Sequence, residues 1–390
     1  MIAMLAVLVA LIGIIGIGLI WKGAELKRLM AVNTLFREDR IVQNFSNMRG
    51  AFLNRDLDIG TGAVSPLPEG TPLEMPAVFA PWAAARHVTS TLVLKNGAIV
   101  HQSYHHGTTE TDLRISWSMA KSYLSVLFGV LVDEGAIPSL DTKVVDLVPI
   151  LKGGAYNSAR IIDVLRMSSG ITFNEDYLDK ASDINRMGRV LALGKRMDDF
   201  AAGLTDTFAK PGDVMQYTSI DTHVLGMVAR AATGRDIVDL MSEKVISRLG
   251  LEATPYYLTD GAGTAFVLGG LNMTTRDYAR FGQMILQRGT WHGQRIVSAE
   301  WVHASVTPSA NTGPGEFQYG YQWWIPEDAT PGKEVMARGI YGQYIYINYE
   351  QSVVVVITSA DRGFRDDGVI ESAVDTCRAI AKATGDENGT

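Results

Sequence analysis

The chain has 390 residues, of which 47% are hydrophobic and 20% are charged. This length and composition support one large domain, or two that share a core, without metal or disulfide crosslinks. The 42 Asp and Glu residues outnumber the 35 Lys and Arg residues, and no basic run is present, so nucleic acid is not an expected partner. The single cysteine, Cys377, excludes an intrachain disulfide and a multi-thiolate metal site.

The first 21 residues predict a membrane anchor. Met1 to Ile20 contains no charged side chain, and about 20 apolar residues are enough for a helix to cross the hydrocarbon core of a bilayer. Trp21 and Lys22 follow, as is typical of a membrane interface. A cleaved signal peptide is the alternative, but no basic region precedes the stretch and no A-x-A site follows it. We therefore expect an uncleaved single-pass helix over residues 1–21, with the membrane as a partner.

Residues 22–81 are expected to be a juxtamembrane segment and a proline-rich linker. Five prolines and several glycines fall between Arg55 and Pro81. Proline removes a backbone donor and fixes φ, so this stretch predicts either an extended linker or a wrapping arm. The catalytic-type domain is expected to begin near Trp82 and to occupy residues 82–385.

Strands are predicted at both ends of this domain. Residues 91–94 and 98–100 flank the Asn-Gly dipeptide at 96–97, which is a strong hairpin signal. Late in the chain, residues 344–348 and 352–358 are rich in β-branched and aromatic side chains, which favour strands. One sheet built from both ends of the domain is the arrangement that these positions predict.

The middle of the domain, from about residue 118 to residue 289, has a mostly helical period, as in the apolar run at 123–132. Residues 375–383 predict a last helix. Strands at both ends that enclose a helical middle indicate an α/β domain with flanking helices and an inserted helical lobe.

Ser118 and Lys121 form the sharpest motif, S-x-x-K, at the start of that apolar run. Positions i and i+3 share a helix face, so the lysine amine can approach the serine hydroxyl. Serine is a poor nucleophile without a base, and a desolvated lysine loses its proton and can act as that base. The alternative is a purely structural role, in which Ser118 caps the N-terminus of the helix and Lys121 is exposed to solvent. This role is less favourable for Lys121, because a cation is destabilised beside the positive end of a helix.

Two further segments carry candidate groups. Tyr217 lies between a Lys-Pro-Gly-Asp turn and a predicted helix, where a tyrosine can relay a proton if a nearby cation holds its hydroxyl acidic. Gly339 and Gly342 flank Ile340 just before a late strand; glycine there lets a substrate lie against the strand edge and frees a main-chain N–H for an oxyanion. Taken alone, each segment is better explained as a packed tyrosine or a plain turn.

In this order the three elements resemble the serine β-lactamase and penicillin-binding-protein superfamily, which carries S-x-x-K on a helix, then a tyrosine motif in a helical lobe, then a Lys/His-x-Gly strand. The resemblance is closest to the class-C-related esterases and amidases that include the 6-aminohexanoate-dimer (nylon-oligomer) hydrolases. It covers about residues 86–383. The supporting stretches are residues 115–122, 165–170, 174–177, 219–226, 269–272, 277–282, 320–324 and 339–344.

The resemblance implies a β-lactamase-like fold with an antiparallel sheet, and it implies a role for each motif. Ser118 would be the nucleophile, Lys121 its base partner, and Tyr217 the group that passes a proton to the leaving group. The backbone N–H groups of Ser118 and Ile340 would form the oxyanion hole. The substrate-binding residues would be Tyr177, Ser219 and Gly339.

Two departures from the superfamily pattern bear on the substrate. Ala337 stands where β-lactamases and transpeptidases have Lys or His, and the adjacent Arg338 should point to the opposite face of its strand. Ser219 stands where true β-lactamases have Asn, and no carboxylate can be assigned as a deacylating base. We therefore expect a small linear ester or amide as the substrate rather than a β-lactam.

Histidines suggest two alternatives. His101, His105 and His106 lie close together, but no recognisable zinc motif accompanies them, so we expect surface histidines and no metal site. The family resemblance likewise implies no metal and no organic cofactor. His223 and Asp221 permit a Ser-His-Asp triad with the nucleophile, although Asp221 is too close in sequence to orient His223 easily.

The location and the class of protein have rival interpretations. Basic residues after the anchor would place the domain in the cytoplasm, but long domains cross a membrane largely regardless of charge, and anchored members of the resembling family usually face the periplasm. We therefore expect an inner-membrane protein with a periplasmic catalytic domain. The functional rivals are a penicillin-recognising sensor that is acylated without turnover and a D-amino-acid peptidase acting on cell-wall peptides.

Overall fold

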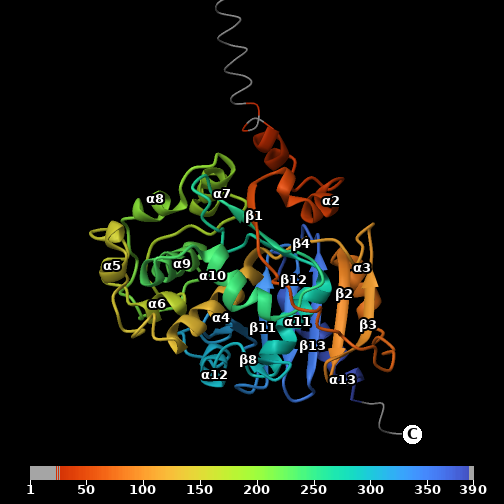
Figure 1. The fold of residues 1–390 in the computed structure, drawn as a ribbon. Coiled ribbons are helices and arrows are strands. Elements are labelled where there is room, and N and C mark those ends of the chain that lie inside the picture. The colour runs from red at the N-terminus through yellow and green to blue at the C-terminus, as the bar shows by residue number, and fades with distance from the viewer. Residues whose placement is uncertain (1–22, 24, 26, 386–390) are drawn as a thin grey trace, which may run out of the picture.

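The computed structural model describes residues 23, 25 and 27–385, and its centre is a sheet of seven strands. These are β2 (Val88–Lys95), β3 (Ala98–Tyr104), β9 (Gln318–Tyr319), β10 (Trp324–Ile325), β11 (Glu334–Gly339), β12 (Gln343–Asn348) and β13 (Val353–Ser359). Their order is β3-β2-β13-β12-β11-β10-β9, with every pair antiparallel. The prediction of one sheet built from both ends of the domain is confirmed, because β2 pairs directly with β13 (Figure 1).

A smaller sheet and a hairpin complete the strands. The small sheet contains β1 (Leu53–Asp56), β4 (Arg114–Ile115), β5 (Tyr256–Thr259) and β6 (Leu271–Met273), in the order β1-β5-β6-β4. The hairpin pairs β7 (Thr290–Trp291) with β8 (Gln294–Arg295). The small sheet matters for the site because β4 leads directly into the segment that carries Ser118.

The helices cover the large sheet and build the lobe beside it. The α-helices are α2 (Ile41–Ser46), α3 (Phe79–Ala85), α4 (Ala120–Asp133), α5 (Val144–Leu147), α6 (Ile161–Leu165), α7 (Asp183–Ala192), α8 (Met197–Ala202), α9 (Ser219–Thr233), α10 (Ile237–Lys244), α11 (Thr275–Leu286), α12 (Ala299–Ser305) and α13 (Val369–Ala383). The 3₁₀ turns are η1 (Met48–Gly50), η2 (Trp117–Met119), η3 (Pro149–Leu151) and η4 (Ile246–Arg248). Helices α5 to α9 form the predicted helical lobe, at one side of the sheet in Figure 1.

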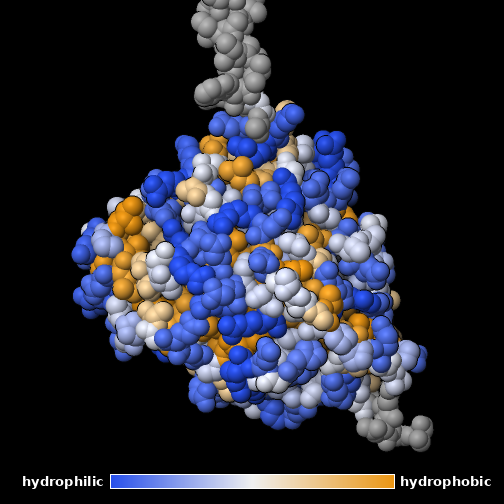
Figure 2. Space-filling model, viewed as in Figure 1, coloured by the Kyte–Doolittle hydropathy of each residue, from blue (hydrophilic) through white to orange (hydrophobic). Residues whose placement is uncertain are grey.

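Alternation along the strands divides the core into two layers. Val93 and Val355 face α3 and α13, where they pack with Cys377, whereas Leu92 and Val354 face the larger core that contains α4 and α11. Strand β13 is buried on both faces, which explains its unbroken apolar run. The surface over these layers is mainly hydrophilic on the face shown in Figure 2, in keeping with the net charge of −7.

The predicted hairpin at residues 91–100 is confirmed by β2 and β3. The last helix was predicted from residue 375 but begins at Val369. Val369 and Ile370 are β-branched and have weak helix propensity, so the sequence pattern does not reveal this first turn. Burial of Val369 against the domain overrides that preference.

The segment ahead of residue 82 is a wrapping arm rather than a free linker. Strand β1 pairs with β5 in the small sheet, and Leu57, Ser65 and Leu73 donate backbone hydrogen bonds to the body of the domain. Upstream of β1, Phe45 is fully buried in the main core. The boundary at residue 82 stays a prediction. The predicted anchor over residues 1–21 lies outside the described residues, and no helix within them is long and apolar enough to span a bilayer.

Candidate active site

Ser118 lies in a tight turn between β4 and helix α4. The turn is η2, and α4 begins two residues after Ser118, so Lys121 falls in the first turn of α4. Lys121 Nζ donates a hydrogen bond to Ser118 Oγ at 3.0 Å. The serine is partly exposed and lines a cavity, whereas the lysine lies beneath it. The i,i+3 approach predicted from S-x-x-K is therefore present.

Lys121 is almost completely buried, with 1% of its surface exposed. Its amine also donates to the backbone oxygen of Leu268 at 2.8 Å and to Ser219 Oγ at 3.3 Å. Loss of hydration disfavours the charged form and lowers the pKa of Lys121 to about 7, although the nearby charge of Glu175 opposes the shift. A substantial share of the protein therefore carries a neutral amine here at neutral pH.

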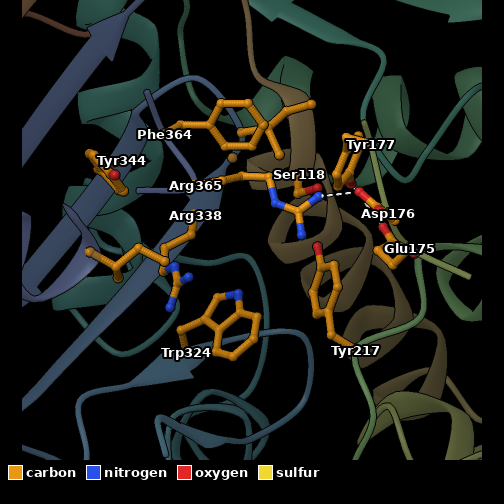
Figure 3. Close-up of a pocket in the computed structure, with 13 residues that line it drawn as sticks. Ser118, Glu175, Asp176, Tyr177, Tyr217, Trp324, Arg338, Tyr344, Phe364 and Arg365 are labelled. Atoms are coloured by element: carbon orange, nitrogen blue, oxygen red, sulfur yellow. Dashed lines mark hydrogen bonds and ion pairs between the residues drawn. The ribbon is translucent and has the colours of Figure 1, made fainter. Parts of the chain in front are cut away.

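Tyr217 reaches the same place from the loop before α9. Its ring centre lies 5.1 Å from Lys121 Nζ, and the ring stacks on Trp324 at 5.2 Å. Figure 3 shows its hydroxyl pointing toward Ser118. The expectation of an acidic Tyr217 hydroxyl is wrong, because burial raises the pKa of Tyr217 well above its ordinary value. The phenol therefore keeps its proton at neutral pH and is available as a donor.

The end of β11 runs directly against the Ser118 turn at Gly339. A Cβ atom at this position would lie 2.4 Å from the backbone oxygen of Ser116 and 3.1 Å from the backbone nitrogen of Ser118. Only glycine permits so close an approach of the two backbones. Ile340, the next residue, lines the cavity together with Ser118. This position is compatible with the predicted role of the Ile340 backbone N–H as the second oxyanion donor.

Glu175 is one of the site residues that the sequence did not single out. Its carboxylate accepts hydrogen bonds from the backbone N–H of Ser219 at 3.0 Å, from Ser219 Oγ at 2.5 Å and from the Tyr177 hydroxyl at 2.8 Å. Ser219 in turn accepts from Lys121, so Glu175 joins the predicted substrate-binding residues to the base. Its place two residues before Tyr177, in a stretch of the resemblance, was the available signal.

The cavity above Ser118 has a volume of about 580 Å³. Its other walls are aromatic and basic, as Figure 3 shows. Across its mouth Arg365 forms an ion pair with Asp176 at 2.6 Å. The lining residues are Ser118, Glu175, Asp176, Tyr177, Tyr217, Trp324, Arg338, Gly339, Ile340, Tyr344, Phe364, Arg365 and Ile370.

Arg338 lines this cavity, which the sequence analysis did not anticipate. Ala337 and Arg338 do point to opposite faces, and Ala337 is buried in the main core. Arg338 nevertheless lines the cavity, together with Gly339 and Ile340 at the end of β11. The Arg338 guanidinium carbon lies 4.3 Å from the ring centre of Trp324 and 4.8 Å from that of Phe317.

His223 and Asp221, the residues of the alternative triad, each bond to other residues. His223 Nε2 bonds to Asp198 at 2.9 Å, and Asp221 accepts from the Tyr156 hydroxyl at 2.7 Å, so these two residues do not form a relay to Ser118. The Ser-His-Asp alternative, which the sequence already disfavoured, is therefore excluded. Within the described part of the chain, no group of three or more His, Cys, Asp and Glu side chains is arranged to hold a metal ion.

Comparison with known proteins places this geometry in a family. Residues 77–375 match the Beta-lactamase family. The chain belongs to that family. The match spans the seven-stranded sheet, the helical lobe and every site residue named above, and the chain is a β-lactamase-related serine hydrolase.

Individual relatives of this Beta-lactamase family protein agree with the match. A 6-aminohexanoate-dimer hydrolase from Paenarthrobacter ureafaciens is 30% identical over 283 residues, which are 69% of this chain and 71% of the relative. A Bacillus anthracis structure assigned as a 6-aminohexanoate-dimer hydrolase is 21% identical with a TM-score of 0.75, covering 89% of this chain and 95% of that one. A penicillin-binding protein from Bacillus halodurans is 16% identical with a TM-score of 0.61, covering 77% and 98%. The two structures support the fold.

Proposed function

We propose that the protein hydrolyses an ester or amide bond of a small linear substrate through an acyl-enzyme on Ser118. The observation that carries this proposal is the buried Lys121 amine, 3.0 Å from Ser118 Oγ and with a pKa of about 7. A neutral amine at that distance can take the hydroxyl proton as the oxygen attacks a carbonyl carbon. A solvated lysine could not, because it would remain protonated at neutral pH.

The remaining groups have places in the same reaction. The backbone N–H groups of Ser118 and Ile340 would hold the negative oxygen of the tetrahedral intermediate. As the intermediate collapses, Tyr217 gives its proton to the leaving group and recovers one from Lys121. Water then attacks the acyl-enzyme, its proton returns to Ser118 through Lys121, and the acid product leaves. Glu175 holds Ser219, and through it the Lys121 amine, in position.

The proposal is tested by labelling and turnover on the full-length protein. A fluorophosphonate should label Ser118, as located by mass spectrometry, and a p-nitrophenyl ester should be hydrolysed at a sustained rate. A burst of one equivalent without steady turnover would favour the acylated sensor instead. Higher activity on D-Ala-D-Ala peptides than on acyl esters would favour the peptidase. Absence of both label and turnover would reject the hydrolase proposal.

Arg338 leads to a prediction about the preferred substrate. Its guanidinium faces the cavity amid aromatic rings, so we expect it to bind a carboxylate carried by the substrate. Arg338→Gln should raise KM about 10-fold for an ester that carries a terminal carboxylate, since a charged hydrogen bond contributes about 1.5–3 kcal/mol. KM for the matched neutral ester should stay within about twofold, as measured by steady-state kinetics.

The matched control is Arg365→Gln, because Arg365 also lines the cavity but is already paired with Asp176. It should affect the carboxylate-bearing ester less than Arg338→Gln does. Equal changes in KM for the charged and the neutral ester in Arg338→Gln would contradict carboxylate recognition.

We also propose that residues 1–21 anchor the protein in the inner membrane with the catalytic domain in the periplasm. The apolar stretch from Met1 to Ile20 and the interfacial Trp21 support the anchor. In intact spheroplasts, protease added outside should then degrade the domain. Protection of the domain until the membrane is disrupted would place it in the cytoplasm.

A further inference from the structure

An aromatic cluster joins the N-terminal arm to the two segments that form the proposed oxyanion hole. The arm contributes Phe36 and Phe45, and the domain contributes Trp117 and Tyr341. Phe36 stacks on Tyr341 with ring centres 5.0 Å apart and planes 11° apart, and it lies 5.9 Å from Trp117. Phe45 meets Trp117 edge-on at 5.5 Å and Tyr341 at 5.3 Å. Each arm ring thus contacts both domain rings.

The two domain rings are the chain neighbours of the proposed oxyanion donors. Trp117 precedes Ser118, and Tyr341 follows Ile340. Both have left-handed backbone conformations, with φ of 43° for Trp117 and 60° for Tyr341. Bulky residues rarely adopt such values, and they persist only where surrounding contacts hold them. The rings of the arm supply such contacts on both sides of the oxyanion hole.

Polar contacts attach the arm at the same place. Arg114, four residues before Ser118, donates from Nη1 to the backbone oxygen of Val42 at 2.6 Å and to Ser46 Oγ at 2.8 Å. These hydrogen bonds connect helix α2 to strand β4, and the two elements lie side by side in Figure 1. The Arg114 side chain is fully buried, so this attachment belongs to the interior of the protein.

The cluster also continues into the wall of the cavity. Tyr341 lies 4.5 Å from Phe364, and Phe364 lies 6.2 Å from Tyr177. Both Phe364 and Tyr177 line the space above Ser118. The region that matches the Beta-lactamase family begins at residue 77, so Phe36 and Phe45 come from a part of the chain that the family match does not include.

We infer that Phe36 and Phe45 are positioning residues for catalysis. They hold Trp117 and Tyr341 in their left-handed conformations, which aims the N–H groups of Ser118 and Ile340 at one point. This inference rests on the proposed function, because it requires an oxyanion to form there. The arm follows the predicted anchor, residues 1–21, in the sequence. The geometry of the oxyanion hole therefore depends on the part of the chain next to that anchor.

Phe36→Ala is the sharpest test, because Phe36 is 39% exposed and its truncation leaves the buried Phe45 in place. With a p-nitrophenyl ester, kcat should fall about 10-fold while KM stays within about twofold. That loss is smaller than the ~10²–10³-fold loss expected when an oxyanion donor is removed outright. Affinity for a boronic acid, which places a negative oxygen in the hole, should fall in parallel with kcat.

Three further variants separate positioning from general damage to the arm. Met30→Ala removes a side chain that is 60% exposed on the same arm but outside the cluster, and it should leave kcat unchanged. Phe36→Tyr keeps the stacked ring and should retain nearly all of the wild-type kcat. Phe45→Leu should lower kcat at least as much as Phe36→Ala, with circular dichroism confirming a folded protein.

The outcomes distinguish this inference from the proposed function. If wild-type protein shows neither a label at Ser118 nor turnover, the proposed function fails. If the wild type turns over and folded Phe36→Ala and Phe45→Leu both match its kcat and boronate affinity, only the positioning inference fails. The positioning inference is also overturned if Met30→Ala lowers kcat as much as Phe36→Ala does.

Discussion

Replacing Ser118 with alanine should reduce turnover of a p-nitrophenyl ester by at least ~10⁴-fold, because the hydroxyl oxygen is the atom that forms the acyl-enzyme. Stability should hardly change. The serine is partly exposed, and Lys121 keeps hydrogen bonds to Leu268 and Ser219 when the Ser118 hydroxyl is lost. Steady-state kinetics and the thermal midpoint measure the two effects, and we expect the midpoint to stay within about 2 °C.

Ser125→Ala is the matched control for this variant. Ser125 lies on the same helix, α4, and is buried away from the cavity. This variant should keep its activity and its fluorophosphonate label, whereas Ser118→Ala should lose both. Retention of more than about 1% of turnover in Ser118→Ala would show that another group is the nucleophile.

The sequence predicted best those features that depend on short-range geometry. Ser118 and Lys121 are three residues apart, so helical geometry alone brings them together whatever the rest of the chain does. The hairpin at 91–100 likewise follows from one local turn signal. The assignment of Tyr217 needed the family resemblance, because its approach to Ser118 depends on how the helical lobe packs against the sheet.

Glu175 and Arg338 were missed because tertiary placement decides what they do. Glu175 bonds to Ser219, which is 44 residues away, and nothing in the loop sequence indicates that partner. For Arg338 the strand alternation was predicted correctly, but its place in the wall of the cavity was not predicted. The cavity is lined by Arg338, Gly339 and Ile340 at the end of β11, and a strand pattern carries no information about which side chains line a cavity.

The sequence of the arm contains a sign of folded structure that its proline and glycine content obscured. Its prolines and glycines indicated irregular chain, and residues 55–81 are indeed mostly irregular. Ahead of them, Ile41, Phe45 and Met48 recur at helical spacing, and all three are buried. That spacing is typical of a helix packed on a core, and it was the available sign that the arm belongs to the folded domain.

The pH dependence of catalysis should report the protonation of Lys121. The group is active when neutral, and its pKa is lowered by burial to about 7. Below that pH the amine is protonated, so kcat/KM should fall about tenfold per pH unit; above it kcat/KM should rise to a plateau. Because burial raises the pKa of Tyr217, loss of its proton should not lower the plateau below about pH 10.

Lys121→Met should lower kcat/KM by about 10²–10⁴-fold and remove the pH dependence near 7, since the thioether has a similar length but cannot take a proton. Glu175→Gln is the informative companion, because the charge of Glu175 raises the pKa of Lys121. Without that charge the midpoint of the profile should move below pH 7. The measurement is kcat/KM for a neutral ester from pH 5 to 9. A flat wild-type profile, or an unchanged midpoint in Lys121→Met, would show that Lys121 is not the base.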